Sequence, residues 1–245
     1  MTRPTFVWAH DLLSCVEHED TIRWFNWERP ADLSQLVRYD ARGHGRGMVQ
    51  YVDRAYRWSA MVDDMLRLAD GPFVAGGIGM GAATALHAAI TAPRRLAGLV
   101  LVAPPAAWTC RDDRAAVYQA LASDADVRGA TAVSEAWPVS GQPSFLRESF
   151  DGPAELLTRH LFGMDPRAIP CILRGAALSD LASQDLVHNV IVPTLILGWS
   201  GDPGHPLAVA EQLSCLMIQN VMHVAHDLND MHKWPDFVGD FLTSI

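Results

Sequence analysis

Residues 73–92, Phe-Val-Ala-Gly-Gly-Ile-Gly-Met-Gly-Ala-Ala-Thr-Ala-Leu-His-Ala-Ala-Ile-Thr-Ala, decide the fold of this chain. The apolar run Phe73–Ala75 is typical of a strand buried on both faces of a sheet. The small residues of Gly81–Ala92 favour a helix that packs closely against that sheet. The glycines between the two segments predict a tight turn. A strand, a turn and a helix in this order form the repeating unit of a parallel α/β sheet.

The rest of the chain repeats this alternation of apolar runs and helical patterns. Further strands are predicted at Phe6–Ala9, Gln35–Tyr39, Gly98–Ala103 and Thr194–Leu197, with a weaker sixth strand around Met217–Val224. Two apolar stripes recur at helical spacing, one of Trp58, Met61, Val62, Met65 and Leu66 and one of Trp234, Phe237, Val238, Phe241 and Leu242. We therefore expect an α/β fold whose mostly parallel sheet of about six strands carries helices on both faces.

The alternation is interrupted between Trp108 and His188, where charged residues and helix formers replace the apolar runs. This pattern predicts several helices and no strand. The chain then divides into a first part of the core (1–107), a helical lid (108–188) and a second part of the core (189–245). An insertion at this point of an open α/β sheet lies over the carboxyl ends of the strands, where ligands bind.

Composition narrows the classes of function. The chain has 245 residues, 19 basic and 28 acidic, so its formal charge of −9 opposes a nucleic-acid partner. No apolar run approaches the roughly 20 residues of a membrane helix, and the amino-terminal residues have no signal-peptide pattern. The four cysteines (Cys15, Cys110, Cys171 and Cys215) lie too far apart for a CxxC pair. These features predict a cytoplasmic protein with no nucleic-acid or membrane partner.

The glycine turn itself has two interpretations. A phosphate-binding loop needs a following Gly-Lys-Ser/Thr, or an acidic residue ending the next strand, and the sequence has neither. A nucleophile elbow, G-x-S-x-G, also lies between a strand and a helix. Gly77-Ile78-Gly79-Met80-Gly81 keeps the flanking glycines of that motif, but Gly79 stands where the serine belongs.

With these segments the chain resembles the α/β-hydrolase superfamily over nearly its whole length. Ala9-His10-Asp11-Leu12-Leu13 resembles the His-Gly segment that supplies an oxyanion-hole amide, and Asp40-Ala41-Arg42-Gly43-His44-Gly45 resembles the turn after the next strand. Gly201-Asp202-Pro203 follows the strand that carries the acid in this superfamily. His226 lies where the catalytic histidine is expected, and the order elbow, acid, histidine is the superfamily order.

Two departures fall within the catalytic apparatus. Gly79 has no side chain, so a seryl acyl-enzyme cannot form. Asp11 replaces a glycine beside the oxyanion site, where a carboxylate opposes the negative charge that the site stabilises. Glycine also relieves the strain of the elbow, which costs about 1–3 kcal/mol for a residue with a Cβ. The resemblance therefore implies a fold that survives the loss of the serine.

What remains is an acid–base apparatus. The resemblance assigns Asp202 and His226 as a catalytic pair, in which Asp202 orients His226 as a base. The amides of Leu12 and Met80 face the pocket, with Asp11 and His10 beside them. His44 is expected to shape its turn, and His205 to begin a helix. The spacing of His223, His226 and His232 fits no zinc pattern, so neither a metal nor a cofactor is predicted.

Three functions follow from these residues. The first is serine-independent acid–base chemistry, of the lyase, cyclase, isomerase or water-activating type, on a small apolar substrate with a carbonyl group. The second is a non-catalytic pseudo-hydrolase that binds a ligand or a partner. The third is an esterase-type hydrolase whose nucleophile has been removed by mutation, although Asp11 would then be a second and unnecessary change.

Overall fold

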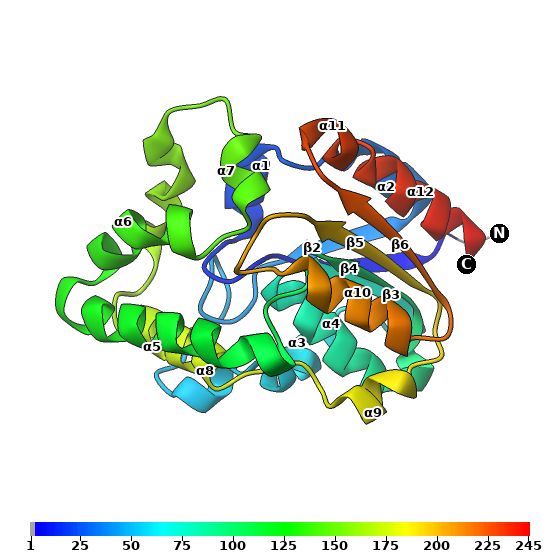
Figure 1. Ribbon diagram of the computed structural model, residues 1–245, viewed down its shortest axis with the longest axis horizontal. Coiled ribbons are helices and arrows are strands. Elements are labelled where there is room, and N and C mark those ends of the chain that lie inside the picture. The colour runs from blue at the N-terminus through cyan, green and yellow to red at the C-terminus, as the bar shows by residue number, and fades with distance from the viewer. Residues whose placement is uncertain (1–2) are drawn as a thin grey trace.

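The computed structural model describes residues 3–245, and its centre is a six-stranded sheet (Figure 1). The strands are β1 (Thr5–Ala9), β2 (Gln35–Tyr39), β3 (Phe73–Ile78), β4 (Leu96–Val102), β5 (Thr194–Trp199) and β6 (Asn220–Ala225). They lie in the order β2-β1-β3-β4-β5-β6, and every neighbouring pair is parallel. The predicted fold class is confirmed, and each predicted strand overlaps an observed one.

Helices occupy most of the chain between and after the strands. The α-helices are α1 (Val16–Ile22), α2 (Glu28–Leu33), α3 (Val62–Leu66), α4 (Met80–Thr91), α5 (Arg111–Arg128), α6 (Ala130–Ser140), α7 (Ser144–Glu148), α8 (Ala168–Ala177), α9 (Gln184–His188), α10 (Leu207–Leu216), α11 (Leu228–Met231) and α12 (Trp234–Ser244). Short 3₁₀ helices are η1 (Asp53–Tyr56), η2 (Trp58–Met61), η3 (Pro93–Arg95), η4 (Trp108–Cys110), η5 (Ala154–Leu157) and η6 (Arg159–Gly163).

Side chains of each strand alternate between two apolar cores on opposite faces of the sheet. In β1, Val7 and Ala9 join the core that contains the apolar residues of α4, whereas Phe6 and Trp8 join the core that contains those of α12. Figure 1 shows α3, α4 and α10 on one side of the sheet and α2 and α12 on the other. The predicted covering of both faces by helices is therefore confirmed.

Two predicted helical segments differ in detail from the structure. The stripe from Trp58 to Leu66 is not one helix, because η2 gives way to α3 after Met61. The segment 108–188 contains helices and no strand, as expected, and in Figure 1 its helices α5, α6 and α7 extend beyond the edge of the sheet. Its role as a lid and its boundaries remain predictions. Among residues 3–245, no helix is both long enough and apolar enough to cross a membrane.

Candidate active site

The elbow is the turn between β3 and α4. Gly79 has φ 52° and ψ −112°, a backbone conformation that strongly favours glycine, and it immediately precedes α4. The flanking glycines are required by close packing against β1. A Cβ on Gly77 would lie 2.6 Å from the carbonyl oxygen of Ala9, and one on Gly81 would lie 2.1 Å from it. The sequence therefore builds a sharp strand-to-helix turn whose position 79 carries no side chain.

The loop after β1 faces this elbow and is held by two buried histidines. His10 accepts a hydrogen bond from the amide of Ala41 through Nε2 (3.0 Å), and its Nδ1–H donates to the carbonyl of Asp11 (2.7 Å). His44 accepts from the amide of Leu13 (3.0 Å). Burial lowers the pKa of both histidines, to about 3 for His44, so both rings are neutral. Because both nitrogens of His10 bind the backbone, this residue fixes the loop and is not a free group of the pocket.

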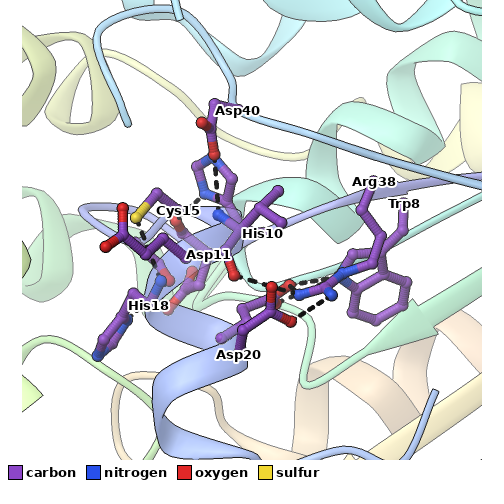
Figure 2. Close-up of polar contacts among 12 residues, drawn as sticks. Trp8, His10, Asp11, Cys15, His18, Asp20, Arg38 and Asp40 are labelled. Carbon is purple, nitrogen blue, oxygen red and sulfur yellow. Dashed lines mark hydrogen bonds and ion pairs between the residues drawn. The ribbon is translucent and has the colours of Figure 1, made fainter. Parts of the chain in front are cut away.

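Asp11 occupies the space where the side chain of an elbow residue would lie. An ideal Cβ built on Gly79 would be 2.0 Å from Oδ1 of Asp11 and 2.7 Å from its Cγ. The amide of Met80, which was predicted to serve an oxyanion, donates instead to Oδ1 of Asp11 (3.0 Å). Figure 2 labels Asp11 on the loop after β1, near His10 and Cys15. The carboxyl of Asp11 thus lies where a side chain at position 79 would begin, and it binds the amide of Met80.

The environment of Asp11 favours its protonated form. Burial raises the pKa of this carboxyl, against the opposing effects of His205 and of the amides of Met80 and Leu12. Only 4% of the residue is exposed, and Oδ2 has no hydrogen-bond partner within the described chain. A carboxyl of this kind keeps its proton to a higher pH than an ordinary aspartate does.

His205 is the second side chain at the elbow, whereas its sequence predicted only the start of a helix. Its Nε2 lies 4.0 Å from Oδ2 of Asp11 and 3.2 Å from the ideal Cβ on Gly79. Its Nδ1 lies 3.6 Å from Oδ1 of Asp202. The residue is 2% exposed. The available signal was its spacing three residues after Asp202 in a Gly-Asp-Pro-Gly-His turn, which lets the two side chains meet.

Asp202 is bound as an anion at the other end of this group. Its carboxylate accepts hydrogen bonds from the amides of Ser144 (2.6 Å), Gly204 (2.7 Å) and His205 (3.2 Å). Although burial acts in the opposite direction, His205 and the amides hold the pKa of Asp202 well below its usual range. Because Ser144 begins α7, Asp202 also fastens the helical segment 108–188 to the loop after β5.

His226 follows β6, as predicted, but its contacts are different from those expected. It is exposed, with Nδ1 3.2 Å from Oγ of Ser200 and its amide bound to Asp230 (3.3 Å). Within residues 3–245, no hydrogen bond or ion pair joins His226 to Asp202. The structure therefore brings Asp202 together with His205, and a catalytic role for His226 stays a prediction.

The groups at the elbow form one line from the amide of Met80 through Asp11 and His205 to Asp202. The two carboxyls lie on opposite sides of His205, and their pKa values are displaced in opposite directions, upward for Asp11 and downward for Asp202. Such an arrangement separates a proton donor from a fixed anion. Nowhere in residues 3–245 do three or more His, Cys, Asp or Glu side chains come together as metal ligands would. The line is suited to moving protons, and it has no nucleophilic hydroxyl at the elbow.

Comparison with known proteins agrees with this architecture. Residues 7–234 match the model of the "Alpha/beta hydrolase family". An esterase from Thermogutta terrifontis superposes with a TM-score of 0.77 at 23% identity, over 99% of this chain and 89% of that one. MenH from S. aureus gives a TM-score of 0.78 at 19% identity, with coverages of 99% and 93%. An enol-lactonase from Burkholderia xenovorans gives 0.69 at 17%, with coverages of 99% and 92%. No sequence of a curated protein matches the chain.

Proposed function

The chain belongs to the alpha/beta hydrolase family, and we propose that it is an enzyme that acts by acid–base chemistry without a serine nucleophile. The single observation that carries this proposal is the position of the Asp11 carboxyl. It fills the side-chain space of the elbow, lies on the amide of Met80 and stands 4.0 Å from His205. In this family fold the reaction takes place at the turn after β3. Acid–base groups at that turn, without a covalent nucleophile, favour proton transfer over acyl transfer.

In this proposal Asp11 is the general acid. Its raised pKa keeps a proton available, and a protonated carboxyl at the elbow donates a hydrogen bond to a substrate carbonyl where a serine would attack it. His205 returns the proton, because its ring lies between the two carboxyls. Asp202 stays ionised and orients His205, a role that a carboxylate commonly has beside a catalytic histidine.

The same contacts disfavour esterase chemistry. A tetrahedral oxyanion needs the amide of Met80, and Asp11 already binds that amide. Polarising a carbonyl and moving a proton beside it leads instead to elimination, isomerisation, cyclisation or activation of water. The buried neighbours Leu12 and Met80 are apolar, which favours a small apolar substrate. Because Asp11 and His205 are nearly inaccessible, we propose that the helical segment 108–188 is a lid that moves to admit it.

The test is turnover of a panel of small carbonyl compounds and metabolites, followed by mass spectrometry. Asp11→Asn keeps the shape of the side chain and its contact with Met80 but removes the acid. We expect this variant and His205→Gln to lose about 100-fold or more of any activity of the wild type. His226→Ala tests the alternative base, and His188→Ala, at an exposed position on α9, is the matched control. Full activity in Asp11→Asn contradicts the proposal.

A second function, that of a ligand-binding pseudo-hydrolase, is favoured by the closure of the elbow. A carboxyl that permanently occupies the oxyanion amide resembles a bound product, and it leaves little room for a substrate. This reading expects no turnover by the wild type or any variant. A simple knockout of an esterase is disfavoured, because a serine at position 79 and Asp11 in its observed place exclude each other sterically.

A further inference from the structure

A large cleft opens away from the elbow, between α1 and the η5–η6 region of the helical segment. Its volume is about 1490 Å³, and its lining includes Ser14, His18, Arg38, Asp40 and His160. Gly79, Asp11 and His205 are not among its lining residues. The cleft is therefore a separate candidate site, and nothing in the proposed acid–base chemistry accounts for it.

The floor of the cleft is a stacked pair of histidines. The rings of His18 and His160 lie 3.7 Å apart between centroids, with 22° between their planes. Nε2–H of His160 donates to the carbonyl of Leu13 (2.7 Å), so its Nδ1 carries a lone pair. Nδ1 of His18 lies 2.9 Å from Oγ of Ser14, a hydroxyl that either donates or accepts. Each ring thus has one nitrogen assigned to a neighbour and one nitrogen left over.

Neither remaining nitrogen, Nε2 of His18 or Nδ1 of His160, has a hydrogen bond of good geometry in the described chain, although the backbone of Leu157 lies near enough to His18 to raise its pKa against the effect of burial. Burial lowers the pKa of His18 to about 2 and that of His160 to about 4, so neither ring is charged near neutral pH. A buried polar atom without a hydrogen bond is costly, and native structures contain few of them. The floor therefore offers Nδ1 of His160 as an unsatisfied acceptor. Nε2 of His18 is either a donor or an acceptor, because the hydroxyl of Ser14 can rotate to match either tautomer of that ring.

The walls of the cleft carry charges of both signs in equal number. The arginines are Arg23, Arg38, Arg46 and Arg159, and the carboxylates are Glu17, Asp20, Asp40 and Asp151. Some already have partners: Arg38 binds Asp20 (2.5 Å), and Asp40 accepts from the amides of Val16 and Arg46. Figure 2 shows Arg38 and Asp20 at one end of this region and His18 at the other. The walls thus have many donors and acceptors and no excess charge.

We propose that this cleft binds a neutral, hydroxyl-rich molecule, of the sugar or polyol class. Hydroxyls that approach the edges of the two rings, in the ring planes, donate to Nδ1 of His160 and accept from Nε2–H of His18, which gives both orphan atoms a partner. Further hydroxyls pair with the arginine and carboxylate groups of the walls. An anion gains no positive charge at the floor and meets the lone pair of His160, whereas an apolar ligand leaves both nitrogens unsatisfied.

The experiment measures binding of myo-inositol and methyl β-D-glucoside at millimolar concentrations by saturation-transfer NMR. Acetate, inorganic phosphate and cyclohexane carboxamide serve as charged and poorly hydroxylated comparisons. In parallel, long-range ¹H–¹⁵N spectra of histidine-labelled protein report the ring nitrogens of His18 and His160. We expect the polyols to bind and to shift these nitrogens, and the comparisons to leave them unchanged.

The variant His160→Phe keeps the stacked ring and removes both nitrogens, and we expect it to weaken polyol binding about tenfold. His223→Phe is the matched control, since His223 also stacks on an aromatic ring (Phe237, 3.8 Å) but lies outside the cleft. Circular dichroism checks that both variants fold, and Ser14→Ala supplies a second, smaller perturbation of the floor. Binding of the anions alone, absence of polyol binding to the wild type, or equal binding by His160→Phe and His223→Phe overturns the proposal.

Discussion

Replacing Gly79 by serine restores the elbow side chain, and the structure predicts that this change alone destabilises the protein. The new Cβ would lie 2.0 Å from Oδ1 of Asp11, so the carboxyl must leave its place. Its departure leaves the buried amide of Met80 without an acceptor, at a cost of about 1–3 kcal/mol. The φ of +52° adds about 1–3 kcal/mol of strain for a residue with a Cβ.

The total loss of about 2–6 kcal/mol corresponds to a fall of the melting temperature on the order of 10 °C in a chain of this size. The double variant Gly79→Ser/Asp11→Ala has no clash, and we expect it to be more stable than the sum of the single changes by about 2 kcal/mol. Asp11→Asn is the matched control, because it keeps the bulk at the elbow and therefore keeps the penalty of Gly79→Ser.

Urea unfolding of the four proteins of this cycle measures the coupling, provided that the slope m is unchanged. Additivity within about 0.5 kcal/mol would refute the reasoning, since it would mean that Asp11 does not occupy the elbow. The cycle has a catalytic counterpart. Gly79→Ser alone should hydrolyse short p-nitrophenyl esters weakly, and Gly79→Ser/Asp11→Gly should exceed both single changes by more than additivity, because the hydroxyl and the freed amide meet at one carbonyl.

Three further outcomes test the architecture around the site. Gly81→Ala places a Cβ 2.1 Å from a backbone oxygen, so the free energy of unfolding of the protein should fall by about 3 kcal/mol or more. Gly71→Ala, whose Cβ meets open space, should change the free energy of unfolding by less than about 1 kcal/mol, and thermal unfolding compares the two variants. Asp202→Asn should speed hydrogen exchange of the Ser144 amide and lower the free energy of unfolding by about 1–3 kcal/mol. Unchanged exchange would mean that Asp202 does not hold α7 against the loop after β5. Burial raises the pKa of Glu19 to about 7, although Arg38 and Trp8 oppose the shift. The contribution of this group to the free energy of unfolding is therefore present below its unfolded pKa near 4.5 and is lost as the pH rises through 7. Unfolding measured across this pH range should show a loss of roughly 3 kcal/mol in the wild type and no such loss in Glu19→Gln.

The fold could be predicted because its signals are local. Short apolar runs such as Phe73–Ala75 and Thr194–Leu197 read as buried parallel strands, and the sheet contains both. The glycines of the elbow predicted a sharp turn, and Gly79 has the positive φ that such a turn needs. Family membership followed from four motifs in the right order, and the family match over residues 7–234 confirms it.

The interior of the site could be predicted only in part, since it depends on rotamers and on contacts between distant segments. The sequence identified Asp11 as an obstacle to an oxyanion, but not as the side chain that fills the space beside Gly79. It assigned His205 to a helix start, because nothing local shows that the loops after β1 and β5 meet at the elbow. His226 was expected from its place after the last strand, whereas its side chain binds Ser200.

The mutual exclusion of Asp11 and a side chain at position 79 also constrains the order in which the two positions can be changed. A serine introduced first meets the carboxyl, and a loss of Asp11 first leaves the Met80 amide without its acceptor while gaining no nucleophile. Each single substitution is therefore expected to lower the stability of the fold, and only a change at both positions avoids the steric conflict.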